Sequence, residues 1–328
     1  MQSLFITYIM RIDNKNLLKA LLCVRANNVF YYENLQNYLS FRPQDCFCKC
    51  LIECDTSRAL IQTLRILKNP KAHAKSFRKS MIPHTILGNG SNTLVANFYD
   101  GYLVKLGKNF RYIKKLKSKN DRILLEVGAG TNLFTLNNFL KLKGIGGLEW
   151  SFGIPGSVGG ATIMNAGAFG QEFGNFICRV KIIENGKFVW KSNIKFSYRN
   201  SSLKENKEIV VAVVLGLYKS SQIDILTKQQ DFLSRRRTSQ PYELNSAGSV
   251  FKRVVKNGEI IYPAKLIDNL GLKGATIRQA EISTKHAGFI VNRGNATGKD
   301  YLVLVELIEN KVKKEYNLTL EREVEILK

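Results

Sequence analysis

The chain has 328 residues, which is enough for about two domains with well-formed cores. Its net charge of +24 would suit nucleic acid, anionic lipid or a polyanionic small molecule. Lysine is spread along the chain without an aromatic-interleaved stripe, so the charge indicates a lysine-rich solvated surface. We therefore expect no nucleic-acid partner and no membrane insertion.

Cysteine usage and the N-terminal residues bear on the compartment. Six cysteines in a chain of this length do not indicate a disulfide framework and favour a reducing compartment. The N-terminal apolar run has neither a cationic start nor a small-residue cleavage site, and it is too short to span a bilayer. We therefore expect no export and a cytoplasmic protein. The apolar spacing then predicts an amphipathic helix over 16–29, so that residues 1–34 would form a helical N-terminal segment.

Four cysteines lie close together in a predicted strand. By alternation, Cys46, Cys48 and Cys50 would share one face of the strand, and Cys54 follows them. A metal site is one interpretation of this cluster. The spacing lacks the paired pattern of zinc ligands, however, and buried free cysteine behaves as a small hydrophobic residue, so we expect no metal.

A second helix is predicted over 56–67 with Thr56 as its N-cap, and a basic linker follows over 69–80. Residues 86–95 then form an apolar strand, a glycine-rich turn and a further apolar run. Such a turn suits a phosphate-bearing ligand because its backbone N–H groups can face an anion. The signal alone is weak, since the dinucleotide pattern G-x-G-x-x-G is missing.

The segment 146–170 is the most unusual stretch of the chain. Strands predicted over 102–107 and 123–130 precede it, with a helix over 131–144 that begins at Thr131. The segment itself carries eight glycines interleaved with core-type residues. Glycine permits close backbone approach and positive φ, and N–H groups freed in such turns form anion-binding nests. We infer a phosphate-bearing cofactor here; a tightly turned loop without a ligand is the alternative.

The final third predicts helices over 222–237, 262–274 and 297–316, the last beginning with a Thr-x-x-Asp capping box. A terminal strand over 320–327 ends the chain.

A collinear series of motifs runs through the chain from about residue 35 to its end. The motifs are GNGSN (88–92), GAGTNL (128–133), GLEWSFGIPGSVGGATIMNAGAFG (147–170), FSYRNSSL (196–203), RRRTSQP (235–241), AGSVFK (247–252), KLIDNLGLKG (265–274), KHAGFIVN (285–292) and LEREV (320–324). Together they resemble the UDP-N-acetylenolpyruvoylglucosamine reductases, flavoenzymes that complete UDP-N-acetylmuramate for peptidoglycan. The resemblance favours the family branch with the shorter, more open substrate cover.

The resemblance implies an α+β fold. An FAD-binding portion of the vanillyl-alcohol-oxidase (PCMH) type, in two α/β subdomains, would occupy 35–221. An α/β substrate-binding domain would occupy 222–328, with a C-terminal strand that returns to the active site.

The resemblance also implies FAD as cofactor and NADPH as hydride donor. Because 146–170 contains no histidine or cysteine for a covalent attachment, we expect the FAD to be non-covalent. The glycine-rich turns would wrap its pyrophosphate and ring system. The implied cofactor-binding residues are Gly88, Asn89, Gly90, Ser91, Asn92, Gly153, Ile154, Pro155, Gly156, Ser157, Gly159, Gly160, Asn165, Ala166, Gly167 and Arg236.

Three residues inherit catalytic roles. In the family a hydride passes from NADPH to flavin N5 and then to C3 of the enolpyruvyl group. Arg199 would bind the developing oxyanion, because its planar charged fork can hold a carboxylate bidentately. Glu323 would orient that site or share its proton, and Ser249 would donate the proton to C2. Taken alone, each has an ordinary interpretation: a surface arginine, an outward strand glutamate and a turn serine.

Five further residues are predicted to contact the UDP-sugar. Lys252 and Arg253 could polarise the serine, and with Lys265 they would add positive charge around the UDP pyrophosphate. Tyr198 accompanies Arg199 in its motif. His286 invites an acid–base role, but we expect a structural or substrate contact because the family's donor is the serine. We expect a monomer.

The chain departs from the family pattern at three turns. Residues 40–45 replace an early turn with paired glycines, and Pro43 fixes φ there. Arg253-Val254 replaces the usual Asn-Pro, and Arg278-Gln279 replaces a glycine pair. The second hypothesis is therefore a flavin-binding paralogue of the same fold whose reductase activity is lost or altered.

Overall fold

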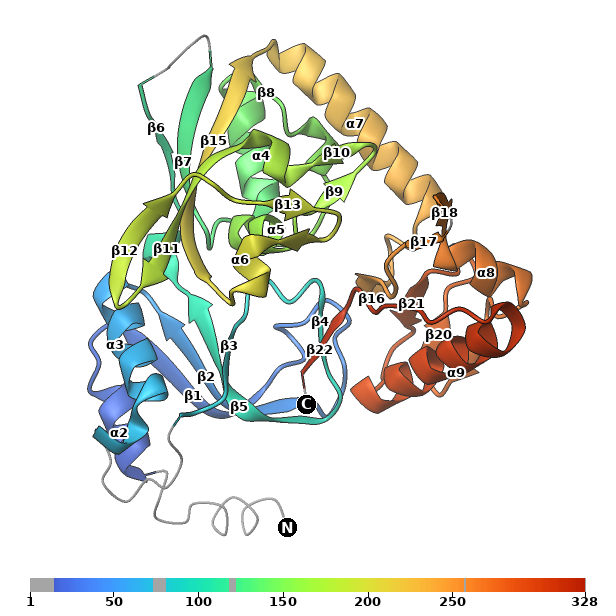
Figure 1. The fold of residues 1–328 in the computed structure, drawn as a ribbon, viewed down its shortest axis with the longest axis horizontal. Coiled ribbons are helices and arrows are strands. Elements are labelled where there is room, and N and C mark those ends of the chain that lie inside the picture. The colour runs from blue at the N-terminus through green and yellow to red at the C-terminus, as the bar shows by residue number, and fades with distance from the viewer. Residues whose placement is uncertain (1–14, 73–80, 118–121, 257, 328) are drawn as a thin grey trace.

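A computed structural model describes residues 15–72, 81–117, 122–256 and 258–327. In Figure 1 the chain builds three sheet-centred units: the first from the blue N-terminal part, the second from the green and yellow middle, and the third from the orange and red C-terminal part. Among the described helices, none has the length and hydropathy needed to cross a bilayer.

The first unit is a four-stranded sheet with two helices packed on it (Figure 1). The N-cap predicted for the second helix is confirmed, since the Thr56 hydroxyl accepts a hydrogen bond from the Ala59 N–H at 3.1 Å. Burying the apolar face of that helix fixes it on the sheet. The elements are α2 (Lys15–Leu22), β1 (Asn27–Asn34), β2 (Phe47–Cys54), α3 (Ser57–Lys68), the 3-10 helix η1 (Pro70–Ala72), β3 (His84–Ile86) and β5 (Phe98–Leu106), with sheet order β1-β2-β5-β3.

The helix predicted through residue 29 was wrong in its second half. Helix α2 ends at Leu22, and β1 pairs antiparallel with β2 instead. Val29 and Tyr31 pack on the core, as alternate residues of a strand do. The β-branched and aromatic residues of this stretch favour a strand once a neighbouring strand is present. Residues 27–34 therefore belong to the first sheet rather than to a helical segment, and the linker predicted over 69–80 lies mostly outside the described residues.

The cysteines of β2 are buried free thiols. The prediction of a single face was wrong for Cys50: Cys46 and Cys48 pack in one apolar cluster, whereas Cys50 and Cys54 pack in another. The pairing of β2 with β5 shifts register between Cys48 and Cys50. Burial raises the pKa of the Cys46 thiol to about 12, so these thiols stay protonated. Within the described part of the chain, no cluster of three or more His, Cys, Asp or Glu side chains is arranged to hold a metal ion.

The second unit is an antiparallel sheet whose helices carry the glycine-rich segment (Figure 1). The helix predicted from Thr131 begins two residues later, at Leu133, because the side chain of Asn132 accepts from the Phe134 N–H at 2.8 Å and caps it. The elements are the 3-10 helix η2 (Lys108–Phe110), β6 (Ile113–Lys115), β7 (Ile123–Gly128), α4 (Leu133–Leu142), β8 (Ile145–Gly146), η3 (Glu149–Ser151), α5 (Val158–Ile163), β9 (Gly167–Ala168), β10 (Gln171–Glu172), η4 (Phe173–Phe176), β11 (Ile177–Glu184), β12 (Lys187–Lys191), β13 (Phe196–Ser197), β14 (Asn200–Ser201), α6 (Ser202–Glu205) and β15 (Ile209–Lys219), with sheet order β12-β11-β15-β7-β6 and β8 also on β15.

The third unit packs two helices on a small antiparallel sheet, and a long helix leads into it from the second unit (Figure 1). The predicted capping box is present: the Thr297 N–H donates to Asp300 Oδ2 at 2.8 Å, and the Asp300 N–H donates to Thr297 Oγ1 at 3.1 Å. The helix predicted over 262–274 stops earlier, at Asn269. The elements are α7 (Gln222–Ser239), β16 (Asn245–Ser249), β17 (Val254–Lys256), β18 (Glu259–Ile261), α8 (Pro263–Asn269), β19 (Thr276–Ile277), β20 (Ala280–Ile282), β21 (Phe289–Asn292) and α9 (Gly298–Tyr316), with sheet order β16-β21-β20-β19.

The three units are held together by shared apolar packing. One apolar cluster runs through the first and second units, and another fills the third. Phe41 enters the third unit's cluster from the first unit and meets the ring of Tyr301 edge-on, with centroids 4.9 Å apart. The side-chain amide of Asn292 donates to the carbonyls of Phe41 and Arg42, both at 3.0 Å. Residues 40–45, where the chain lacks the family's glycines, therefore anchor the third unit to the first.

The C-terminus forms a second anchor between the units. Strand β22 (Glu325–Leu327) runs parallel to β4 (Thr93–Val95), and the two lie side by side at the centre of Figure 1. The strand predicted over 320–327 is thus shorter than expected, with only an isolated bridge from Arg322 to Phe251 before it. This pairing carries the residues just before β22 to the glycine-rich turn that precedes β4.

Candidate active site

The two glycine-rich turns predicted to hold the cofactor face each other. A Cβ atom on Gly88 would lie 2.8 Å from Ser157 Oγ, and one on Gly156 would lie 3.2 Å from Ser91 Oγ. Gly90 has φ +62°, and a Cβ there would lie 2.0 Å from the carbonyl oxygen of Tyr38. At Gly90 the fixed backbone of Tyr38 leaves room for glycine alone, whereas a Cβ at Gly88 or Gly156 would crowd a serine hydroxyl of the facing turn.

The second turn is held rigidly by its neighbours. The Leu133 N–H donates to the Gly156 carbonyl at 3.0 Å, and the Val158 N–H donates to the Thr131 carbonyl at 2.8 Å. The Gly159 N–H donates to the Ala129 carbonyl at 2.8 Å. The motif GAGTNL therefore serves as the support on which the turn of Gly156 is built.

The backbone donors of these turns fit a phosphate-bearing cofactor. Within the described residues, no acceptor is recorded for the N–H groups from Asn89 to Asn92, nor for those of Gly156 and Ser157. Polar backbone groups normally find partners when they are withdrawn from water. Donors gathered from two facing turns match the oxygens of a pyrophosphate.

Arg236 supplies a buried positive charge beside the same turns. Its exposed fraction is 6%, and its Nη2 donates to the Trp150 carbonyl at 3.2 Å, while its Nε has no partner among the described residues. The pKa of this guanidinium is lowered to about 10, chiefly by burial; Tyr242 opposes the decrease and the charge of Arg199 adds to it. A Cβ on Gly153 would lie 3.3 Å from Arg236 Cδ. An anionic group next to this turn would complete the site.

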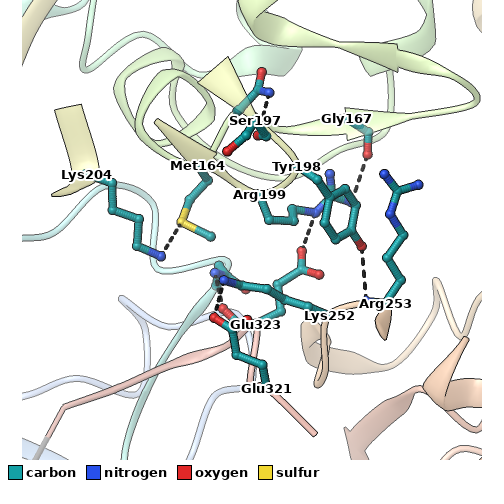
Figure 2. A network of polar contacts seen from close by, with 12 residues as sticks. Met164, Gly167, Ser197, Tyr198, Arg199, Lys204, Lys252, Arg253, Glu321 and Glu323 are labelled. Atoms are coloured by element: carbon teal, nitrogen blue, oxygen red, sulfur yellow. Dashed lines mark hydrogen bonds and ion pairs between the residues drawn. The ribbon is translucent and has the colours of Figure 1, made fainter. Parts of the chain in front are cut away.

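Arg199 and Glu323 form the centre of the site. Figure 2 shows the two side chains pointing toward each other, and Arg199 Nε donates to Glu323 Oε1 at 2.6 Å. Arg199 Nη2 also donates to the Gly167 carbonyl at 3.0 Å. Arg199 lies on the tight turn between β13 and β14 with φ +53°, a conformation that non-glycine residues rarely adopt. Strain of this kind gathers at functional sites.

Glu323 is brought here by its backbone. Its N–H donates to the Val250 carbonyl at 2.8 Å, and its carbonyl accepts from Asn92 Nδ2 at 2.9 Å. Ser249, at the end of β16, is the chain neighbour of Val250. Burial raises the pKa of the Glu323 carboxyl, and the nearby charges of Arg199, Lys252 and Lys204 oppose that rise. The chain thus brings Arg199 and Glu323 into contact next to the strand end that carries Ser249.

The side chain of Asn165 is committed to the protein. Its Nδ2 donates to Glu172 Oε2 at 2.7 Å and to the Ser197 carbonyl at 2.9 Å, and its Oδ1 accepts from the Gly174 N–H at 2.9 Å. Because Ser197 begins the turn that presents Arg199, this buried amide supports the active-site turn.

The glycine-rich segment 146–170 also contains the remaining predicted cofactor residues Ile154, Pro155, Gly160 and Ala166.

Three of the five predicted substrate residues lie beside the pair of Arg199 and Glu323. Two of them, Tyr198 and Arg253, join the second and third units. Arg253 stacks on Tyr198, with its Cζ 4.0 Å from the ring centroid, and the Arg253 N–H donates to Tyr198 Oη at 3.4 Å. Lys252 pairs with Glu321 at 2.5 Å. Figure 2 shows these pairs flanking the pair of Arg199 and Glu323.

The other two predicted substrate residues lie outside this network. Lys265 is exposed on α8. His286 Nδ1 accepts from the Gly288 N–H at 3.1 Å, and burial lowers the pKa of the imidazole. The Gly288 carbonyl accepts from the Val250 N–H at 2.9 Å, so the histidine loop does reach the strand end that carries Ser249.

Lys204 was missed by the sequence analysis. Its Nζ donates to Met164 Sδ at 3.3 Å, and its charge acts on the Glu323 carboxyl (Figure 2). The signal that could have found it is Ser201, whose hydroxyl accepts from the Lys204 N–H at 3.2 Å and caps α6 directly after the turn of Arg199. Helix α6, which begins at Ser202, therefore carries Lys204 close enough for its charge to act on Glu323.

Comparisons with known proteins agree with this geometry. Residues 70–190 match the FAD binding domain family, and residues 240–327 match the C-terminal domain of UDP-N-acetylenolpyruvoylglucosamine reductase. A UDP-N-acetylenolpyruvoylglucosamine reductase of Thermotoga petrophila is 44% identical over 247 residues, which are 75% of this chain and 84% of that protein. One of Clostridium botulinum is 37% identical over 93% of this chain and 94% of its own length.

A solved structure extends the likeness to the fold. The UDP-N-acetylenolpyruvylglucosamine reductase of Thermus caldophilus superimposes with a TM-score of 0.73 at 31% identity, covering 92% of this chain and 99% of that one. The predicted α+β fold class is confirmed. The chain therefore belongs to the UDP-N-acetylenolpyruvoylglucosamine reductase family, as an oxidoreductase with an FAD-binding domain.

Proposed function

We propose that this protein uses NADPH to reduce UDP-N-acetylenolpyruvoylglucosamine to UDP-N-acetylmuramate, a step of peptidoglycan precursor synthesis. The observation that carries the proposal is the pair of Arg199 and Glu323, held at 2.6 Å where the cofactor turns meet the third unit. We also propose a cytoplasmic monomer in which residues 35–221 bind FAD and residues 222–328 bind the UDP-sugar. Helix α7 begins the proposed sugar-binding region, and its Arg236 contacts η3 of the FAD-binding region.

FAD would lie between the two facing turns, with its pyrophosphate on the N–H groups of Asn89 to Asn92, Gly156 and Ser157 and with Arg236 adding charge. When bound, it would supply a carrier that accepts a hydride from NADPH and delivers it to the substrate. The chain's own contribution is to hold the cofactor, to orient the enolpyruvyl group and to move a proton.

Arg199 and Glu323 would act on the substrate carboxylate. Arg199 retains donors beyond those used on Glu323 and on the Gly167 carbonyl, so its guanidinium can bind a carboxylate while the pair stays in place. Interactions that strengthen as the oxyanion develops lower the barrier. Glu323, whose pKa is raised by burial, keeps the guanidinium in a fixed orientation.

Ser249 would donate the proton to C2. A hydroxyl is a weak acid, so the role requires nearby positive charge in a site partly closed to water. Arg199 and Lys252 supply that charge on either side of Glu323, whose backbone is bonded to the residue after Ser249. The stacked pair of Tyr198 and Arg253 would extend the cationic surface toward the UDP pyrophosphate, together with Lys252, Lys265 and His286.

The altered turns support the enzyme over the paralogue without activity. Arg278 adopts φ +51° in the turn where the family has glycines, so the backbone keeps the left-handed conformation. Arg42 and Asp45 likewise have positive φ in the segment 40–45. These turns therefore hold residues in the left-handed conformation that glycine adopts freely, although the side chains differ from the family pattern.

The purified protein is expected to carry FAD that is released on denaturation, since the turns offer backbone N–H groups and no attachment residue. Absorbance in the filtrate after unfolding in guanidinium chloride and ultrafiltration measures the release. Gly156→Ala should lower FAD retention because a Cβ there approaches Ser91 Oγ. Gly170→Ala is the control, because its φ is also positive, +78° against +141° at Gly156, but there is open space around the new Cβ. Colour that stays with the unfolded chain would contradict the prediction.

The KM for the UDP-sugar is expected to rise several-fold as salt increases from about 0.01 M to about 0.15 M, because the Debye length falls from about 30 Å to about 8 Å. Initial rates at saturating NADPH measure this. A KM independent of salt, or tight duplex-DNA binding that competes with the UDP-sugar, would overturn the assignment of the cationic residues to the pyrophosphate.

The proposed function is tested by NADPH oxidation that depends on UDP-N-acetylenolpyruvoylglucosamine. UDP-N-acetylglucosamine, which lacks the enolpyruvyl group, is the control and should not support turnover. Equal rates of NADPH oxidation with the two sugars, or no NADPH oxidation with either sugar, would refute the proposal.

A further inference from the structure

The side chain of Asn92 makes a contact that the cofactor turn does not require. Its Nδ2 donates to the Glu323 carbonyl at 2.9 Å, joining residues 231 positions apart in the sequence. The Asn92 carbonyl accepts from the Glu325 N–H at 3.0 Å, and the parallel pairing of β4 with β22 continues from there. Asn92 thus forms hydrogen bonds with the residues on both sides of Val324, namely Glu323 and Glu325.

A second segment holds the same peptide from the opposite side. The Glu323 N–H donates to the Val250 carbonyl at 2.8 Å, and the Lys252 N–H donates to the Glu321 carbonyl at 2.9 Å. The backbone of Glu323 is therefore fixed between β16, which ends at Ser249, and the turn that contains Asn92.

The carboxylate of Glu323 depends on this backbone support. Among the described residues, its recorded side-chain hydrogen bond is the one from Arg199 Nε at 2.6 Å. No other hydrogen bond of that side chain would restore its position if the peptide shifted. Since a displacement of about 1 Å can cost about 10²-fold in rate, the backbone anchors set the geometry of the pair.

We propose that Asn92 is a positioning residue for Glu323: its side-chain amide links the turn that holds the cofactor pyrophosphate to the carboxylate that orients Arg199. The inference rests on the proposed function, in which Glu323 serves the reduction of the UDP-sugar. It gives the Asn92 side chain a role distinct from the backbone N–H groups of its turn, which face the cofactor. Binding of FAD and placement of the carboxylate are then coupled through one residue.

The test compares Asn92→Ala and Asn92→Asp with Glu323→Gln in the flavin-loaded enzyme. Asn92→Asp keeps the size of the side chain but turns a carboxylate oxygen toward the Glu323 carbonyl. Both Asn92 variants should slow reoxidation by the UDP-sugar about 10-fold to 100-fold more than they slow reduction by NADPH. Combined with Glu323→Gln, they should add less than about twofold, because a residue that acts through Glu323 has nothing left to position. Asn97→Ala, just after β4 and without a recorded side-chain hydrogen bond among the described residues, should show no such dependence on Glu323.

Amide hydrogen exchange in the flavin-free protein gives a readout independent of activity. Exchange at residues 321–327 should accelerate in both Asn92 variants and stay at the wild-type rate in Asn97→Ala. Rate effects of the Asn92 and Glu323 variants that multiply, or unchanged exchange at 321–327, would overturn the inference and leave the proposed function intact. Full reoxidation activity in Glu323→Gln would instead overturn the role of Glu323 itself, and the inference with it.

Discussion

Ser249→Ala is expected to slow reoxidation of the enzyme by the UDP-sugar by about 10²-fold to 10⁴-fold, which is the usual loss when a positioned general acid is removed and corresponds to about 3–5 kcal/mol of barrier. Reduction by NADPH should be unchanged, since that step needs no proton from the hydroxyl. Stopped-flow absorbance of the flavin separates the two half-reactions.

Two further variants sharpen the Ser249 result. Ser249→Cys should recover part of the rate because a thiol can still donate a proton. Ser246→Ala is the matched control, since Ser246 lies in the same strand and pairs with Val291. Equal slowing of both half-reactions in Ser249→Ala would indicate general damage to the site. Reoxidation at the wild-type rate would return Ser249 to the role of a turn residue.

Arg199→Lys is expected to lower the rate of reoxidation by about 10²-fold to 10³-fold, as removal of an oxyanion donor does. Arg199 uses two directions at once, toward Glu323 at 2.6 Å and toward the Gly167 carbonyl at 3.0 Å, and must still face the substrate. The compact ammonium group of lysine keeps the charge but cannot reproduce this planar arrangement.

The control for Arg199→Lys is Arg179→Lys on β11, where the guanidinium lies 4.5 Å from the Trp190 ring centroid and no cofactor turn is involved. This control should stay within about twofold of wild type, as surface substitutions usually do. An Arg199→Lys enzyme with unchanged reoxidation would show that charge alone suffices at this position.

Local signals made much of the scaffold predictable from the sequence. Thr56 and Thr297 cap their helices as their spacing indicates, because capping is decided within a few residues. The glycines of the two turns could be predicted to serve close approach, and the turns do face each other at Gly88 and Gly156. The strand at 27–34 was missed because its apolar residues fit a helix until β2 is placed beside it.

The contacts that build the reactive site could not be obtained from local patterns. Asn92 and Glu323 are 231 residues apart, and only the folded pairing of β4 with β22 brings them together. The motif predicts that the amide of Asn165 contacts the cofactor, yet its hydrogen bonds join it to Glu172, to Gly174 and to Ser197 at the turn of Arg199. Lys204 carries no motif of its own, and its charge reaches Glu323 through the position of a short helix.

The most direct test of the central claim is a single turnover under anaerobic conditions. Enzyme reduced with one equivalent of NADPH is mixed with UDP-N-acetylenolpyruvoylglucosamine, and the flavin spectrum and the mass of the product are followed together. We expect the oxidised flavin spectrum to return in step with a product that carries two more hydrogen atoms than the substrate, as UDP-N-acetylmuramate does. Flavin that is reduced by NADPH but stays reduced in the presence of the UDP-sugar would contradict the account.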